Sequence, residues 1–170
     1  FEAIKSAGFA SVRIPIKWSA HAEVRAPYTI DPRFFERIDW AIDQALSRGL
    51  NAVINVHHYD GMDADPDGHE ARLIGLWAQI ADRYKGRSDA LYFELLNEPH
   101  DRLTDERWNQ IVPRLLETIR KSNPSRMVVI GPGQWNNWRN VPNLRLPDSD
   151  RHVILTFHYY EPFEFTHQGA

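Results

Sequence analysis

Short apolar runs alternate with amphipathic stretches along the chain. The runs are rich in Val, Ile, Leu and Phe, a composition typical of β-strands that are covered on both faces. Amphipathic helices are predicted between them, because apolar side chains there recur at helical spacing. The five strand-like runs cover residues 11–16, 52–56, 91–95, 127–130 and 153–157.

Three amphipathic stretches have clear helix boundaries or breakers. Gly49 ends the first, and Thr104 is a candidate N-cap for the third. Pro113 lies inside the third, so we expect a kink or break near Val112. Residues 131–147 show no helical period and predict a long functional loop with a short helix. The three stretches span residues 35–46, 73–84 and 108–119.

This alternation of strands and helices predicts a parallel sheet. Both a doubly wound sheet and a (β/α)8 barrel fit the pattern, but polar or aromatic residues follow every strand, as in a barrel. We predict an α/β fold, a truncated (β/α)8 TIM barrel with about five of its eight strands. The strand-end residues are Lys17-Trp18, His57-His58, Asn97-Glu98, Gln134-Trp135 and His158-Tyr159-Tyr160.

Composition restricts the classes of function. The 170 residues carry a net charge of −3, which gives no support for a nucleic-acid partner. No apolar run approaches the roughly 20 residues of a membrane span. Cysteine is absent, which excludes thiolate chemistry and disulfides. The six Trp and six Tyr are many for this length, and they suit a core or flat sugar-stacking surfaces.

Asn97 and Glu98 carry the strongest chemical signal. A carboxyl group at the end of a buried strand can have its pKa raised by desolvation and act as an acid near neutral pH. The alternative is a solvated Glu on a capped strand end. Retaining glycosidases need a second carboxylate about 5–5.5 Å away. Glu94 would lie roughly 13 Å away along the strand, so we expect it to form a core ion pair instead, whereas Glu161 and Asp60 stay possible.

At these motifs the chain resembles glycoside hydrolase family 5, the cellulase family, and within it bacterial endoglucanases. The resemblance covers nearly the whole chain, and residues 161–170 resemble the loop after strand six. It implies that residues 1–170 are a partial catalytic domain, roughly strands 2–6, lacking strand 1 and strands 7–8. The matching motifs are Val12-Arg13-Ile14-Pro15, Val56-His57-His58-Tyr59, Leu95-Leu96-Asn97-Glu98-Pro99 and His158-Tyr159-Tyr160.

The resemblance implies catalytic roles for strand-end residues. Glu98 would be the general acid/base, and Asn97 would bind the sugar 2-hydroxyl group. Arg13 would keep the nucleophilic carboxylate ionised, although it could instead form a structural ion pair with Glu94. The family places its nucleophile at the end of strand seven, beyond Ala170, so the chain alone is expected to be inactive.

The aromatic strand-end residues are expected to line the cleft. Of His57 and His58, one should face the substrate and the other a loop, and the resemblance favours His57 for the substrate side. The resemblance also places His158 and Tyr160 in the cleft, although both could simply support the core.

Trp135 is the expected sugar platform, with Trp138 as a second candidate and Trp18 in either the core or the rim. No metal is predicted, because no third His or inward carboxylate has metal-ligand spacing.

The expected function is a retaining endo-β-1,4-glycosidase, an endoglucanase that hydrolyses β-glucan or a related polysaccharide without a cofactor. The alternatives are an inactive carbohydrate-binding remnant, or a β-mannanase or xyloglucanase of the same clan. A metal-dependent hydrolase is a more distant alternative. The parent protein is expected to be monomeric and secreted or periplasmic.

Overall fold

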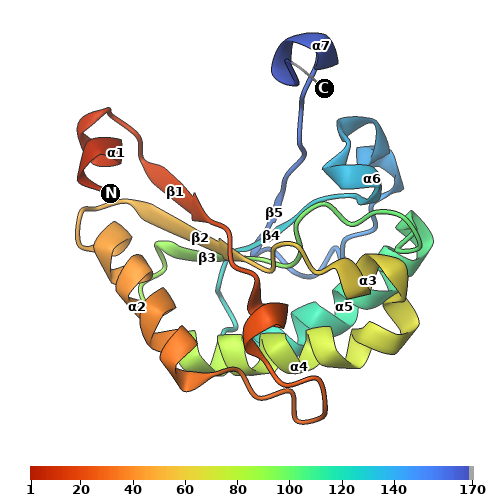
Figure 1. Ribbon diagram of the computed structural model, residues 1–170, viewed down its shortest axis with the longest axis horizontal. Coiled ribbons are helices and arrows are strands. Elements are labelled where there is room, and N and C mark those ends of the chain that lie inside the picture. The colour runs from red at the N-terminus through yellow and green to blue at the C-terminus, as the bar shows by residue number, and fades with distance from the viewer. Residues whose placement is uncertain (169–170) are drawn as a thin grey trace.

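The computed structural model describes residues 1–168 and shows one parallel sheet (Figure 1). The strands lie side by side in the order in which they occur in the chain, without a switch point. A doubly wound sheet would reverse its strand order at such a point, so the order favours the predicted barrel. The strands are β1 (Ser11–Ile14), β2 (Asn51–Asn55), β3 (Leu91–Glu94), β4 (Val128–Ile130) and β5 (Val153–Leu155).

Three long helices lie along one side of the sheet (Figure 1). They are α2 (Pro32–Leu46), α4 (Pro66–Tyr84) and α5 (Asp105–Arg120). No helix of residues 1–168 is long and apolar enough to cross a membrane. The shorter elements are α1 (Glu2–Ser6), η1 (Trp18–His21), α3 (Asp60–Ala64), α6 (Gly133–Asn136), η2 (Trp138–Asn143) and α7 (Phe163–Thr166).

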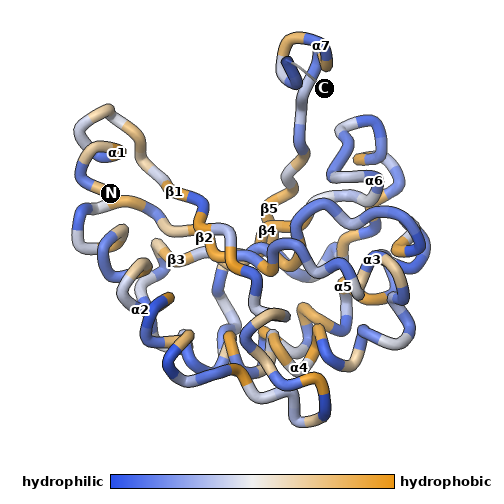
Figure 2. Tube along the Cα trace, in the orientation of Figure 1, coloured by the Kyte–Doolittle hydropathy of each residue, from blue (hydrophilic) through white to orange (hydrophobic). Residues whose placement is uncertain are grey.

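The apolar core lies between the long helices and the sheet, where Figure 2 shows hydrophobic segments facing one another. Trp77 of α4 packs on Phe93 of β3, with 5.4 Å between ring centroids. Trp18 is fully buried and donates its indole N–H to the carbonyl of Asn55, so it is a core residue. The prediction of strands covered on both faces is wrong for β1 and β5, whose residues are half-buried or exposed because each strand lies at an edge of the sheet.

The expected break near Val112 does not occur, because α5 runs through Pro113 as one helix. Proline removes one helical N–H and crowds the preceding turn. Pro113 lies on the exposed side of α5, where water can solvate the freed carbonyl group, while Val112 and Leu115 anchor the helix in the core. The predicted N-cap is confirmed, since the hydroxyl oxygen of Thr104 accepts the N–H of Arg107.

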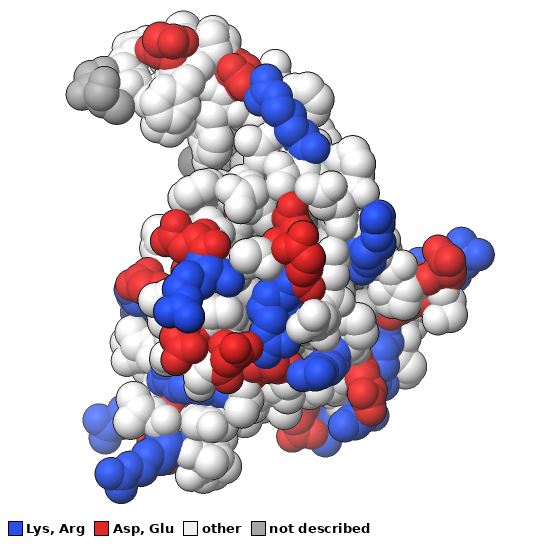
Figure 3. Space-filling view, turned by 90° about the vertical axis from the view of Figure 1, so that its right-hand side faces the viewer, with Lys and Arg blue, Asp and Glu red and all other residues white. Residues whose placement is uncertain are grey.

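Charged side chains of opposite sign lie next to one another on the face seen in Figure 3. Glu70 of α4 receives hydrogen bonds from both Arg107 and Arg114 of α5. These contacts tie the two helices together outside the core. The intermixing of signs on this face leaves no broad basic surface there of the kind that binds nucleic acid.

Candidate active site

Asn97 and Glu98 lie three and four residues after the last residue of β3, at the carboxyl end of the sheet. Glu98 has a left-handed backbone (φ 48°), and its Oε1 lies 2.5 Å from Nδ1 of His158. The hydrogen bond from His158 lowers the pKa of Glu98 below its ordinary value, and this outweighs the effect of burial. The expectation of a raised pKa is therefore wrong for the described residues, because it considered burial alone.

Arg13 of β1 contacts both Glu94 and Asn97. Its guanidinium donates to both carboxylate oxygens of Glu94, at 2.6 and 2.7 Å, and Glu94 is only 2% exposed. The same guanidinium donates to Oδ1 of Asn97 at 2.7 Å. The predicted core ion pair of Glu94 is confirmed. Because Arg13 can only donate, it fixes the orientation of the Asn97 amide, with Oδ1 as the acceptor and Nδ2 on the other side.

His57 and His58 differ in their surroundings. His57 is half-buried, and its Nδ1 lies 3.0 Å from Nδ2 of the buried Asn55. Burial and the neighbouring His58 lower the pKa of His57 to about 4, so its ring is neutral at neutral pH. His58 is exposed and has a left-handed backbone (φ 49°).

The predicted loop at residues 131–147 contains α6 and η2 and carries both candidate platform residues. Trp135 and Trp138 are 49% and 41% exposed. Asp105 holds this loop, because its carboxylate accepts the N–H of Gly133 at 3.1 Å and the side-chain amides of Asn140 and Asn143. Three successive residues of α6, Gln134 to Asn136, have left-handed backbones, so the turn is strained.

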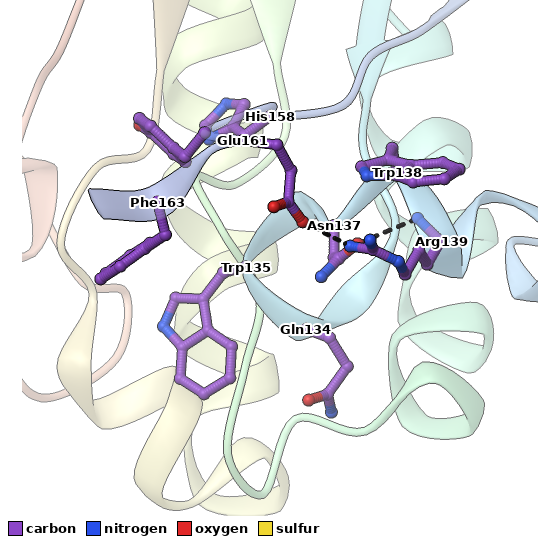
Figure 4. A pocket seen from close by; sticks show the side chains of 9 residues that line it. Gln134, Trp135, Asn137, Trp138, Arg139, His158, Glu161 and Phe163 are labelled. Atoms are coloured by element: carbon purple, nitrogen blue, oxygen red, sulfur yellow. Dashed lines mark hydrogen bonds and ion pairs between the residues drawn. The ribbon is translucent and has the colours of Figure 1, made fainter. Parts of the chain in front are cut away.

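A cavity of about 270 Å³ opens between this loop and the segment after β5 (Figure 4). Trp135 and Trp138 of the loop line it together with His158 and Tyr160 of the segment after β5. His158 also holds Glu98, so it links the cavity to the carboxyl group. Tyr160 is 49% exposed, and its ring lies edge-on to that of His158, so it belongs to the cavity wall and not to the core.

The other strand-end carboxylates are engaged elsewhere. Glu161 pairs with Arg139 across the cavity mouth (Figure 4), and Asp60 pairs with Lys17. Both pairs are substantially exposed. No cluster of three or more metal-ligating side chains occurs within residues 1–168. The expected loop after strand six includes Gly169 and Ala170, which lie outside the described residues.

Three residues of the site were missed in the sequence analysis. Asp105 holds the loop, His100 stacks on Trp135, and the buried Asp63 contacts His100. His100 directly follows the motif that ends at Pro99, so its position was the available signal. Asp63 and Asp105 lie in helical stretches where acidic residues are common, and the sequence alone gave no reason to select them.

Comparison with known proteins identifies the family. Residues 1–170 match the model described as Cellulase (glycosyl hydrolase family 5). The chain is 45% identical over 168 residues to endoglucanase H of Acetivibrio thermocellus, covering 99% of this chain and 19% of that protein. It is 34% identical over 173 residues to cellodextrinase A of Ruminococcus flavefaciens, covering 96% of this chain and 51% of that protein.

Solved structures agree with this assignment. The crystal structure of endoglucanase Cel5A from the hyperthermophilic Thermotoga maritima matches with a TM-score of 0.97 and 48% identity, covering 99% of this chain and 55% of that one. Complexes of that protein with mannotriose and with cellobiose have been solved. The chain thus spans about half the length of this relative, whose fold is a TIM barrel. The chain belongs to glycosyl hydrolase family 5, the cellulase family, and its five parallel strands form part of a (β/α)8 barrel.

Proposed function

We propose that the protein is a retaining endo-β-1,4-glycosidase that cleaves β-glucan, with Glu98 as its general acid/base. One observation carries this proposal: Asn97 and Glu98 stand together at the end of β3, each held by a separate partner. Arg13 orients the Asn97 amide, and His158 holds the Glu98 carboxylate. Family membership and the endoglucanase relatives support the reaction class.

In this mechanism Glu98 first donates a proton to the glycosidic oxygen and later removes one from the attacking water. The described residues favour its ionised form, which suits the second step. The first step needs the protonated form. A nucleophilic carboxylate about 5–5.5 Å away would raise the pKa of Glu98 by charge repulsion until the covalent intermediate forms. We propose that this nucleophile lies outside residues 1–168.

The surrounding residues take supporting roles. Asn97 donates to the sugar 2-hydroxyl group, a contact that strengthens in the transition state. Arg13 and Tyr160 stabilise the ionised nucleophile, and Trp135 stacks against a sugar ring. The Thermotoga relative binds both cellobiose and mannotriose, which supports a β-1,4-linked hexose polymer as the substrate. Glucan is the first candidate, and mannan and xyloglucan are the alternatives.

The test is Glu98→Gln in the full-length protein. Loss of a general acid should lower kcat/KM on β-glucan about 10²- to 10⁴-fold. Aryl β-cellobiosides with good leaving groups need no protonation, so their kcat/KM should fall much less. Glu117→Gln, an exposed position on α5, is the matched control and should leave both rates unchanged.

Equal losses on both substrates would contradict the acid role. Exposed Trp135 and Trp138 beside the cavity also support a second candidate, a carbohydrate-binding protein without hydrolytic activity. Glucan binding that is weakened by Trp135→Ala, with no turnover by the full-length protein, would favour that candidate. Parallel assays on mannan and xyloglucan would settle the substrate.

A further inference from the structure

His100 lies two residues after Glu98 and contacts its backbone. Its Nδ1 is 2.6 Å from the carbonyl oxygen of Glu98. A carbonyl oxygen only accepts, so Nδ1 carries a hydrogen and donates it. This bond closes the turn in which Glu98 has its left-handed conformation, an unfavourable one for a residue with a side chain. His100 therefore stabilises the backbone that aims the Glu98 carboxyl group.

The same imidazole supports Trp135. The two rings stack with 4.8 Å between centroids and 21° between planes. The N–H of Trp135 also donates to the carbonyl of Pro99, at 3.1 Å. The loop after β3 and the loop after β4 are thus joined twice, both times beside Glu98. Because the indole is 49% exposed and lines the cavity, His100 covers part of it and leaves the rest for a ligand.

Asp63 of α3 fixes His100 from behind. It is 6% exposed, and its Oδ1 accepts the backbone N–H of His100 at 3.2 Å and lies 3.5 Å from the ring Nδ1. Its own carbonyl accepts the N–H of Arg102 at 3.1 Å. On the other side of the ring, Nε2 lies 3.8 Å from the exposed Asp101 carboxylate. The ring is therefore held by backbone and carboxylate contacts as well as by Trp135.

We propose that His100 is a positioning residue that sets the distance and angle between the Glu98 carboxyl group and the Trp135 platform. This rests on the proposed function, because it assigns Glu98 to proton transfer and Trp135 to sugar stacking. A sugar ring stacked on Trp135 is then placed in register with the acid that must reach its glycosidic oxygen. Small errors in such register are costly, since a misplacement of about 1 Å can lower a rate about 10²-fold.

Two substitutions in the full-length protein separate the two contacts. His100→Phe keeps a flat ring beneath Trp135 and removes the donor to the Glu98 carbonyl. His100→Asn keeps an N–H donor near the position of Nδ1 and removes the ring. We expect His100→Phe to lower kcat about 10- to 100-fold with KM within about twofold. We expect His100→Asn to raise KM for cello-oligosaccharides about 3- to 10-fold, with a much smaller fall in kcat.

A double-mutant comparison tests the link to Trp135. In a Trp135→Ala background, His100→Asn should have no further effect on KM, because its ring no longer has a partner. His152, at the opposite end of the sheet before β5, offers matched controls, and His152→Phe and His152→Asn should leave kcat and KM unchanged.

Thermal melting of each variant shows whether the variant is folded. The proposal is overturned if both His100 variants change kcat and KM by the same factors, or if neither changes them while Glu98→Gln abolishes hydrolysis. It is also overturned if His100→Asn still raises KM in the Trp135→Ala background. Unchanged hydrolysis in Glu98→Gln would refute the proposed function instead.

Discussion

The turns that enter the strands and the turns that leave them both contain residues in the left-handed backbone conformation. The two sets of turns use different residue types at these positions. The turns before β1, β2 and β3 contain Gly8, Gly49 and Gly86, with φ angles of 87°, 67° and 81°. The turns after β2 and β3 use His58 and Glu98, with φ angles of 49° and 48°, and the turn after β4 uses residues 134–136.

This difference separates folding from function. Glycine adopts a left-handed conformation without a steric penalty, whereas other residues lose about 1–2 kcal/mol. Glycine cannot supply an imidazole, a carboxyl group or an indole. The entering turns are therefore unstrained. The leaving turns have strained backbones at positions where candidate site residues lie. Strain of this kind concentrates where surrounding contacts hold it in place.

The largest effects should come from one arginine at each end of the strands, Arg13 near the carboxyl end of β1 and Arg126 before β4. Arg13→Met leaves the buried Glu94 carboxylate without its partner and should lower the free energy of unfolding by about 3–5 kcal/mol. In the full-length protein, which this and the following kinetic measurements use, it should also abolish hydrolysis, since Asn97 loses its support. Urea unfolding and kcat/KM per folded molecule measure the two effects.

Arg126→Met is the counterpart at the entering end. Arg126 is 5% exposed and donates to four carbonyl groups around the turn before β3, those of Tyr84, Arg87, Ser88 and Leu91. Its loss should cost several kcal/mol of stability, at about 1–3 kcal/mol per unsatisfied group, and leave kcat/KM of the folded protein intact. A fall in kcat/KM as large as that of Arg13→Met would contradict the division between the two ends.

A smaller effect should follow from Gly86→Ala. No atom lies within 4 Å of the added Cβ, so its left-handed φ alone is responsible for the cost. We expect the free energy of unfolding to fall by about 1–2 kcal/mol, with KM unchanged. Urea unfolding measures the first quantity, and steady-state kinetics measure the second.

Gln134→Gly is the matched variant in a leaving turn. It relieves a left-handed φ of 53° and should raise stability by about 0.5–1 kcal/mol after the entropy cost of glycine. It should also raise KM, because the freed turn holds Trp135 less firmly. A loss of stability in Gln134→Gly would mean that the leaving turns are not strained.

The smallest effect concerns pH. Burial raises the pKa of Asp63 to about 6 from 3.8, so its contribution to stability is full below pH 3.8 and is lost as the pH rises through 6. Burial lowers the pKa of His57 to about 4 from 6.5, so its contribution is full above pH 6.5 and is lost as the pH falls through 4. The contribution of Asp63 to stability therefore falls with rising pH, whereas that of His57 rises, so the two slopes of stability against pH have opposite signs.

Asp63→Asn removes the first slope. Its stability should therefore rise more steeply with pH than that of the unmodified protein between about pH 4 and 6.5. Urea unfolding across this range measures the slopes, and His57→Asn should change the slope in the opposite direction. A slope in Asp63→Asn no steeper than that of the unmodified protein would show that Asp63 does not titrate as its burial implies.

The strands and long helices were predictable because their signals are local. The apolar runs marked all five strands, although four observed strands are shorter than their runs and β2 begins and ends one residue earlier than predicted. Of the kink or break expected near Val112, the break was a wrong prediction, because it depended on which side of α5 Pro113 faces. The burial of Glu94 followed from its place within a strand, and the structure confirms it.

The electrostatics of the site were not predictable from local patterns. The pKa of Glu98 depends on His158, which lies 60 positions later in the chain. The stacking of His100 on Trp135 depends on the relative placement of two loops. Such contacts leave no periodic trace, since each joins single residues in segments that follow different strands. Family resemblance pointed to several of the same residues but said nothing of His100 or Asp63.

The agreement between strand order and chain order has a consequence for synthesis on the ribosome. Each of β2 to β5 pairs with the strand made immediately before it, so every new strand finds its partner already present. The sheet can therefore grow in the direction of translation, and each added strand closes a loop only to the strand before it. The bond between His158 and Glu98 is made after all five strands have emerged. The candidate acid stays incomplete until the sheet beneath it has been assembled.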